Sequence, residues 1–223
     1  MATSTVEDYL KQIYQAQLAA PGSLIPTGQV ATSLEVAPGT ATAMVKTLAD
    51  SGLVDYEPYS GVRLTEAGEK LATHVLRRHR LVELFLVEVM GMDWSEVHGE
   101  AEQLEHTVSN RLLERIDAML DHPEVDPHGD PIPTPGGEVA ATNYASLITC
   151  PVGESMILVR VADQASGFLQ LIERHGLVPG TTVQVVTRDE QADTVEIRPL
   201  TGTPVSLGFR AASKIQVSPA EAS

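Results

Sequence analysis

Histidine and carboxylate side chains cluster at helical spacing in the middle of this chain, and these residue types bind divalent metal ions. They are His79, Glu83, His98, Glu102, Glu105 and His106, with Asp126 further along. Imidazole and carboxylate donors without a thiolate suit manganese, iron(II) or zinc. The alternative is a solvated acidic helix face that happens to carry histidines. The concentration of seven such side chains in one stretch favours a metal centre.

The spacing of these donors predicts two metal sites rather than one. Apolar residues recur every three or four positions over 75–90 and 94–120, so both segments are predicted to be helices. The four donors on the second helix share an arc of about 100°, but the two ends of that row lie about 10 Å apart along the axis. One ion can hardly be shared by both ends. We therefore expect one site near His79, Glu83 and His98, and another near Glu102, Glu105 and His106.

Composition and charge narrow the class of protein. The 223 residues include no apolar run of about 18 or more and no basic-then-apolar leader, so we expect a cytoplasmic protein that does not enter a membrane. The single cysteine, Cys150, excludes an internal disulfide framework. The formal charge of −15 opposes charge-driven binding of nucleic acid, and residues 71–140 hold 14 acidic against 5 basic side chains. Bound cations would cancel part of that charge.

The first third of the chain has the element order of a winged helix-turn-helix. Three amphipathic segments, beginning near Val6, Thr27 and Thr40, precede a predicted hairpin over 53–64. The helix from Thr40 to Ser51 is the predicted recognition helix, after a break at Ala37-Pro38-Gly39. The candidate DNA contacts are Thr27, Pro38, Gly39, Thr40, Thr42, Ala43, Lys46 and Arg63. Because few of these are basic, a winged helix that contacts only proteins is the alternative.

The remaining segments predict a dimer surface and a β domain. Apolar stripes over 81–89 and 108–120 favour pairing with a second copy, which would present two recognition helices to palindromic DNA; a self-contained core is the alternative. The Pro- and Gly-rich segment 122–137 is a predicted linker. Beyond it a helix near 168–175 and short strands predict a small β-barrel. The strand candidates are 156–160, 182–186, 195–198, 204–207 and 215–217.

The chain resembles the diphtheria toxin repressor family, metal-dependent repressors that include the manganese transport regulators. The resemblance covers nearly the whole chain and is most specific in EDYLKQIY, RRHRLVELFL, VHGEAEQLEH and HPEVDPHGDPIP. It implies a mainly α fold with small β parts: a winged helix-turn-helix domain over 1–72, a helical dimerisation and metal-binding domain over 73–140, and an SH3-like (FeoA-like) β-barrel over 141–223. It also implies a homodimer, not an enzyme, that binds double-stranded operator DNA when metal-loaded and represses metal-uptake genes.

The resemblance further implies which residues bind metal. The implied ligands are Asp8, Glu102, Glu105 and His106 at a primary site, His79, Glu83 and His98 at an ancillary site, and Asp163 and Gln164 from the SH3-like domain. Iron-sensing members carry sulfur at the positions of Asp8 and Glu102, so oxygen donors here favour Mn²⁺, with Fe²⁺ as the alternative. Lys11 stands where some binuclear manganese sensors have a carboxylate. Asp126, beside His128, replaces a linker cysteine, and either residue could assist an extra site.

A mechanism follows from the expected position of Asp8 on the first helix. Metal joining Asp8 to ligands of the dimerisation domain would fix the angle between the two domains, and without metal the carboxylates would repel one another. Two rival classes remain. A metalloenzyme is disfavoured because the sequence has no HExxH or paired ExxH motif. A metal-independent winged-helix adaptor would leave the metal donors unexplained.

Overall fold

The computed structural model describes residues 3–220 and separates them into two compact units. The first unit runs to His79 and adds Glu105–Val108 and Pro133–Val139; the second comprises Arg80–Leu104, Ser109–Ile132 and the residues from Ala140 onward. One long helix, α4 (Glu66–Glu88), passes from the first unit into the second. Within residues 3–220 no helix is both long and apolar enough to cross a bilayer.

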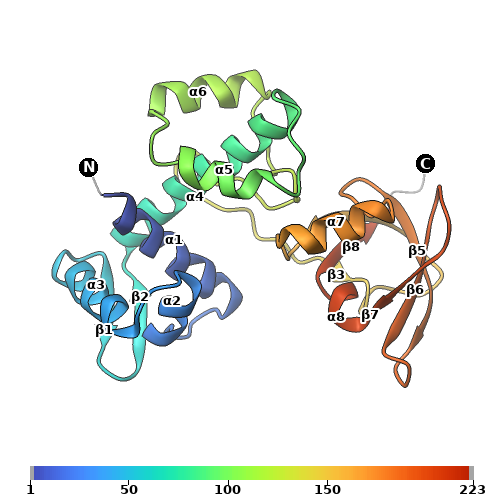
Figure 1. Cartoon of the computed structure of the whole chain (residues 1–223), viewed down its shortest axis with the longest axis horizontal. Helices are drawn as coiled ribbons and strands as arrows, with labels where there is room; N and C mark the ends of the chain where they lie inside the picture. The colour runs from blue at the N-terminus through green and yellow to red at the C-terminus, as the bar shows by residue number, and fades with distance from the viewer. Residues whose placement is uncertain (1–2, 221–223) are drawn as a thin grey trace. The chain divides into compact units, whose positions relative to one another are not determined.

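The first unit is built on a winged helix-turn-helix, as predicted. Its elements are α1 (Ser4–Ala19), α2 (Thr27–Ser33), α3 (Pro38–Asp50), β1 (Val54–Glu57) and β2 (Gly61–Leu64), the blue and cyan part of Figure 1. The two strands pair antiparallel to form the wing, and Val62 of β2 also bridges to Ile25 ahead of α2. The apolar faces of all five elements meet in one core, in which Leu10, Ile13 and Val45 are fully buried.

The recognition helix begins two residues earlier than predicted. Pro38 lies in its first turn rather than in a break, because the fixed φ of proline suits that position and its missing N–H is not needed there. Thr27 is the first residue of α2, whose N-cap is Pro26. Just after α3, Gly52 has a φ of +70°, the left-handed conformation in which helices commonly end.

The prediction of a single helix over 94–120 is wrong. The chain forms α5 (Val97–Leu104) and α6 (Asn110–Met119), separated by a turn. Ser109 has extended backbone angles and caps α6, because its side chain accepts the N–H of Leu112 at 3.3 Å. Glu105 and His106 therefore follow the end of α5 and do not share its face.

The apolar stripes assigned to a dimer surface are partly used within the second unit. Leu81, Ile116 and Ile132 form a small buried core that joins α4, α6 and the linker. Other side chains of α6 stay at the surface, where Leu112 is 51% and Met119 is 66% exposed. This exposed apolar face agrees with the expectation of a partner.

The C-terminal part of the second unit is a six-stranded antiparallel sheet with order β3-β8-β4-β5-β6-β7 (Figure 1). The strands are β3 (Ala145–Ser146), β4 (Ser155–Val161), β5 (Thr182–Asp189), β6 (Thr194–Pro199), β7 (Val205–Gly208) and β8 (Ile215–Pro219), and the helices are α7 (Ser166–Arg174) and α8 (Phe209–Ala212). All five predicted strands and the predicted helix are present. Within the described residues β3 and β7 are the two edge strands of this sheet.

Two segments from outside this sheet pack against it. Trp94, from the turn between α4 and α5, belongs to the apolar core of the C-terminal domain and is 8% exposed. The linker runs along β4, where the N–H of Val161 donates to the carbonyl of His128 at 2.8 Å. Gly129 permits this approach, because its φ is +86° and a Cβ there would lie 1.9 Å from the carbonyl oxygen of Val159.

Candidate metal centres

The first cluster of metal-binding side chains lies in the first unit. His106 stands between two carboxylates, with Nδ1 2.8 Å from Oε2 of Glu7 and Nε2 2.8 Å from Oδ1 of Asp8. Glu105 Oε1 is 3.5 Å from the same Nε2. Asp8, Glu105 and His106 each offer one donor atom, and these atoms lie within 4.8 Å of one another. The oxygen and nitrogen donors fit a divalent cation.

Cationic side chains already neutralise part of this cluster. The Lys11 ammonium lies 2.6 Å from Oε1 of Glu105, with both side chains almost fully buried. Nδ1 of His79 lies 2.6 Å from Oε2 of the same carboxylate, and Arg78 pairs with Glu7 at 2.7 Å. A metal ion at Glu105 would therefore compete with the Lys11 ammonium for that carboxylate.

The second cluster, Glu83, Asp126 and His128, lies entirely within the second unit and is more deeply buried. The side chains of all three residues are inaccessible to solvent. His128 Nδ1 is 3.9 Å from Oε2 of Glu83 and 3.9 Å from Oδ1 of Asp126. One donor atom from each residue falls within 4.8 Å of the other two. The linker thus delivers two donors to a carboxylate of α4.

Hydrogen bonds prepare His128 to donate a lone pair. Its Nε2 lies 2.9 Å from the carbonyl oxygen of Trp94, which can only accept, so Nε2 carries the hydrogen. The lone pair is then on Nδ1, which has no hydrogen-bond partner among residues 3–220. Oδ2 of Asp126 also accepts no hydrogen bond from these residues, and its nearest cation is Arg80, with Nε at 3.6 Å. Buried nitrogen and oxygen atoms whose lone pairs accept no hydrogen bond are suitable ligands for a metal ion.

The electrostatics of Asp126 favour a cation over an isolated carboxylate. Burial raises the pKa of this carboxyl well above its usual value, and the nearby Asp130 and Glu83 carboxylates raise it further, although Arg80 lowers it. Oδ1 accepts the backbone N–H groups of His128 at 2.8 Å and of Asp130 at 3.0 Å. One oxygen therefore shapes the loop while the other remains available.

Several expected ligands meet different partners from those anticipated. His79 was expected with Glu83 and His98, and within the first unit it contacts Glu105. His98 and Glu102 were expected at different sites, and within the second unit Nε2 of His98 is 3.6 Å from Oε1 of Glu102. Nδ1 of His98 is 3.1 Å from Oε1 of Glu83, as the expected ancillary site requires. The side chain of His98 is 45% exposed and that of Glu102 is 37% exposed, so both are accessible to solvent, unlike the second cluster.

Asp163 and Gln164, the ligands expected from the SH3-like domain, contact other side chains of the second unit. Asp163 pairs with Lys214 and accepts the N–H of Ala165 at 2.9 Å. Gln164 donates from Nε2 to Oδ2 of Asp130 at 2.8 Å, so it supports the linker beside the second cluster. Asp163 is thus paired within the C-terminal domain, and Gln164 is hydrogen-bonded to the linker.

The candidate DNA-contacting residues lie mainly at the surface of the winged helix. Pro38, Gly39, Thr40, Ala43, Lys46 and Arg63 are exposed, and Thr27 and Thr42 are half-buried. The Thr42 hydroxyl donates to the carbonyl of Pro38 at 2.9 Å, and Arg63 pairs with Asp55 at 3.2 Å. Tyr59, at the tip of the wing, is fully exposed with a φ of +68° and was not among the candidates. Its Pro-Tyr-Ser-Gly turn was the available signal.

Asp126 and His128 were expected only to assist an extra site, whereas the structure places both in the second cluster. Both lie in the HPEVDPHGDPIP segment, in which two potential donors stand two positions apart. That pattern in a proline-rich linker was the available signal. Their partner Glu83 lies about 40 positions earlier, a separation at which helical periodicity gives no information.

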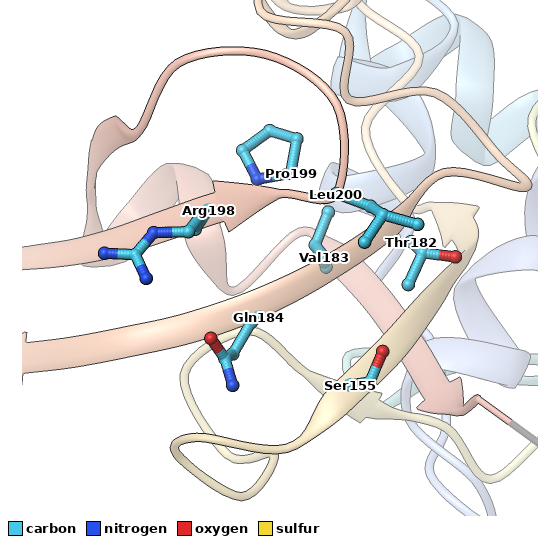
Figure 2. A pocket seen from close by; sticks show the side chains of 7 residues that line it. All are labelled: Ser155, Thr182, Val183, Gln184, Arg198, Pro199 and Leu200. Atoms are coloured by element: carbon cyan, nitrogen blue, oxygen red, sulfur yellow. The ribbon is translucent and has the colours of Figure 1, made fainter. Parts of the chain in front are cut away.

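A pocket on the C-terminal sheet is lined by other types of side chain than the two clusters (Figure 2). Its lining residues are Ser155, Thr182, Val183, Gln184, Arg198, Pro199 and Leu200. None of these side chains is a carboxylate, imidazole or thiol. The pocket therefore offers no ligand set for a metal ion.

The fold and the clusters define a class of protein: a winged-helix DNA-binding regulator with clustered imidazole and carboxylate side chains that fit divalent metal ions. Sequence models of three families match the chain. They are the iron dependent repressor N-terminal DNA binding domain over residues 1–62, the iron dependent repressor metal binding and dimerisation domain over 65–134, and the FeoA domain over 145–219.

Known proteins place the chain in one family. The iron-dependent repressor IdeR of Mycobacterium bovis is 33% identical over 197 residues, which cover 82% of this chain and 84% of IdeR. A solved manganese-dependent transcriptional repressor in complex with manganese is 38% identical with a TM-score of 0.87, covering 96% of this chain and 100% of that chain. ScaR with bound Zn²⁺ is 33% identical with a TM-score of 0.79, covering 96% and 99%.

The chain belongs to the iron-dependent repressor family, which includes the diphtheria toxin repressors. It is a divalent-metal-dependent transcriptional repressor and not an enzyme. The resemblance noted in the sequence is therefore confirmed. Proteins of this family bind operator DNA through the N-terminal domain.

Proposed function

We propose that this chain is a cytoplasmic, manganese-dependent repressor that acts as a homodimer. When it is loaded with metal, it binds operator DNA and controls metal-uptake genes. The observation that carries the proposal is the second cluster, in which His128 directs an imidazole lone pair toward two buried carboxylates. Two carboxylates without a cation are costly in a low-dielectric interior. Arg80 Nε lies 3.6 Å from Oδ2 of Asp126, too far for a hydrogen bond.

The choice of manganese rests on the chemistry of the donors. Every proposed ligand is a nitrogen or an oxygen, and carboxylate-rich sites suit hard ions. Among the relatives, one structure contains manganese, ScaR is bound to Zn²⁺, and IdeR is named for iron. Iron(II) is the alternative signal, because affinity alone follows the Irving–Williams order and does not select manganese.

We assign two metal sites to each chain. The proposed ligands are Asp8, Glu105 and His106 at the first site, and Glu83, Asp126 and His128 at the second, with His79, His98 and Glu102 as further candidate donors. A bound divalent ion supplies positive charge between carboxylates that otherwise repel. Asp8 comes from α1, whereas Glu105 and His106 come from the turn after α5, so the first site ties the winged helix to that turn. Asp163 and Gln164 remain candidate ligands from the C-terminal domain, and their side chains contact Lys214 and Asp130.

The DNA-binding proposal places α3 in the major groove of each half-site, with two copies of the chain related by a two-fold axis. Lys46 lies exposed on α3 and would contact a phosphate, and exposed Tyr59 at the wing tip would contact the flanking backbone. The domain limits 1–72, 73–140 and 141–223 remain part of the proposal.

The first experiment measures operator binding by fluorescence anisotropy, using a duplex selected from a random pool. Wild type is compared in chelator, Mn²⁺, anaerobic Fe²⁺ and Zn²⁺. We expect tight binding with Mn²⁺ and loss of binding in chelator. A preference for Fe²⁺ would change the signal and keep the mechanism, whereas equal binding in chelator would overturn the metal switch.

A second experiment tests the recognition helix with Lys46→Ala. Removing one phosphate contact should weaken operator binding at every sequence and reduce the salt dependence of log K by about one unit. Arg174→Ala, an exposed charge on α7 of the C-terminal domain, is the matched control. An unchanged salt slope for Lys46→Ala would remove this residue from the DNA surface.

A further inference from the structure

The only tryptophan of the chain, Trp94, joins the C-terminal core to the second cluster. Its indole packs among buried side chains of the C-terminal sheet and is 8% exposed. The turn that presents it is fixed by Asp93, whose Oδ1 accepts the backbone N–H of Ser95 at 2.8 Å and its hydroxyl at 2.6 Å. Trp94 therefore has little freedom to move without disturbing that core.

Trp94 contacts His128 in two ways. Its carbonyl oxygen accepts from Nε2 at 2.9 Å, which fixes the tautomer. Its ring stacks on the imidazole, with ring centroids 5.5 Å apart and an angle of 29° between the planes. The carbonyl sets which nitrogen carries the lone pair, and the stacked ring restricts rotation of the imidazole away from Glu83 and Asp126.

The backbone of His128 is held by the same domain. Its carbonyl accepts the N–H of Val161 in β4 at 2.8 Å. The next residue, Gly129, is packed against the Val159 carbonyl too closely for any side chain. Asp130 is held by Arg160 at 2.5 Å. The position of this imidazole thus depends on the folded sheet at both its ring and its backbone.

We propose that Trp94 is a positioning residue for His128, and that through it metal binding at the second cluster and folding of the C-terminal domain stabilise each other. The proposal rests on the assignment of Glu83, Asp126 and His128 as a metal site. Residues that orient a histidine ligand commonly change metal affinity by about 10- to 100-fold when they are removed. Because coupling is reciprocal, metal should protect the C-terminal domain against unfolding by a matching amount.

The test compares Mn²⁺ affinity, measured by isothermal titration on the full chain, among four proteins. They are wild type, Trp94→Ala, Trp94→Phe and Leu169→Ala. Leu169, on α7, is 1% exposed in the same core and has no role at His128, so it controls for loss of core packing. We expect Trp94→Ala to weaken the second-site affinity by about 10- to 100-fold. Trp94→Phe, which keeps a stacking ring, should restore most of it.

The control variant Leu169→Ala shows whether the weaker Mn²⁺ binding of Trp94→Ala is more than a result of lower stability. Leu169→Ala should lower the melting temperature of the C-terminal domain and leave Mn²⁺ affinity near the wild-type value. Wild-type affinity in Trp94→Ala, or an equal loss in Leu169→Ala, would overturn the positioning role.

The emission of Trp94 supplies an independent signature, since no other tryptophan contributes. Mn²⁺, a paramagnetic quencher, should reduce this emission in wild type and not in His128→Ala. If His128→Ala binds and quenches like wild type, the metal-site assignment itself fails. If His128→Ala loses the response while Trp94→Ala keeps its affinity, only the positioning role fails.

Discussion

Asp126 is the residue at which folding and metal binding make opposite demands. Its carboxyl group is buried beside Asp130 and Glu83, and the pKa is raised by that burial and by the two neighbouring charges. The same exclusion from water that destabilises a lone carboxylate strengthens its attraction for a cation. A functional carboxylate of this kind therefore reduces stability until the cation is present.

Asp126→Asn should raise the melting temperature in chelator and remove most of the Mn²⁺-induced rise. The amide keeps the oxygen that accepts the N–H groups of His128 and Asp130, and it removes one of three crowded negative charges. Differential scanning fluorimetry with and without Mn²⁺ measures both effects. A variant that is less stable in chelator and equally responsive to Mn²⁺ would contradict the role given to Asp126.

The pH dependence of the metal-free protein should have a definite sign. Because the folded-state pKa of Asp126 lies above its unfolded value of about 3.9, the folded state binds more protons. Its contribution to stability is therefore present below that unfolded value and is lost as pH rises toward the folded pKa. Urea midpoints in chelator should fall less steeply with rising pH in Asp126→Asn than in wild type.

Lys11 is the second residue whose environment makes a prediction. Its ammonium is buried against Glu105 at 2.6 Å, so Lys11→Met would leave that carboxylate without its closest cation. Breaking a buried ion pair costs about 3 to 5 kcal/mol, which should appear as a lower urea midpoint in chelator. Mn²⁺ should recover more stability in this variant than in wild type. Lys70→Met, at an exposed position of α4, is the control. An equal fall of the urea midpoint in Lys70→Met would show that the buried ion pair is not the cause.

At the scale of elements, the packing of the linker on β4 decides where the second cluster forms. The bridge between Val125 and Pro131 closes a tight loop, and Gly129 at its tip touches the backbone of Val159. Such an approach is open only to glycine. The loop carries Asp126 and His128 to α4 for that reason.

Gly129→Ala should weaken Mn²⁺ binding and destabilise the second unit by roughly 1 to 3 kcal/mol, since the new Cβ forces the loop away from β4. Gly153→Ala is a matched control, because Gly153 has a φ of +84° and nothing lies within 4 Å of a Cβ there. Titration calorimetry and urea unfolding separate the two positions. Equal behaviour of the two variants would show that backbone strain alone, and not contact with β4, is responsible.

At the scale of the whole molecule, each compact unit contains its own cluster of candidate metal ligands. Asp8, Glu105 and His106 belong to the first unit, and the cluster of Glu83, Asp126 and His128 belongs to the second. A ligand that binds only the folded state stabilises it by about 2.7 kcal/mol at a free concentration of 100 times Kd. Metal should therefore protect both units and not only one.

Calorimetric unfolding should show Mn²⁺ raising the transitions of both units in wild type. In Asp126→Asn the transition of the second unit should lose most of its shift, while that of the first unit keeps it. A chain in which neither transition moves with Mn²⁺ would contradict the metal proposal. A shift confined to the second unit would remove only the first site, where Lys11 already neutralises Glu105.

The sequence by itself determined the elements and the types of donor. Apolar periodicity and turn residues, which act over a few neighbouring positions, predicted the winged-helix order, the hairpin over 53–64, the five longer C-terminal strands and a helix over 75–90. That helix, α4, runs from Glu66 to Glu88, so its beginning was not predicted. The absence of any thiolate among the donors was equally plain. The break between α5 and α6 was missed, because the apolar spacing continues through the Ser109 cap.

Only the tertiary structure decided which donors meet. His79 contacts Glu105 across 26 positions, and His128 approaches Glu83 across a longer stretch that includes α5, α6 and the linker. Such pairings depend on the path of the chain after α5 and on the packing of Gly129 against β4, and neither leaves a periodic mark in the sequence. The helical spacing that first drew attention to these candidate donors therefore could not show which of them lie together.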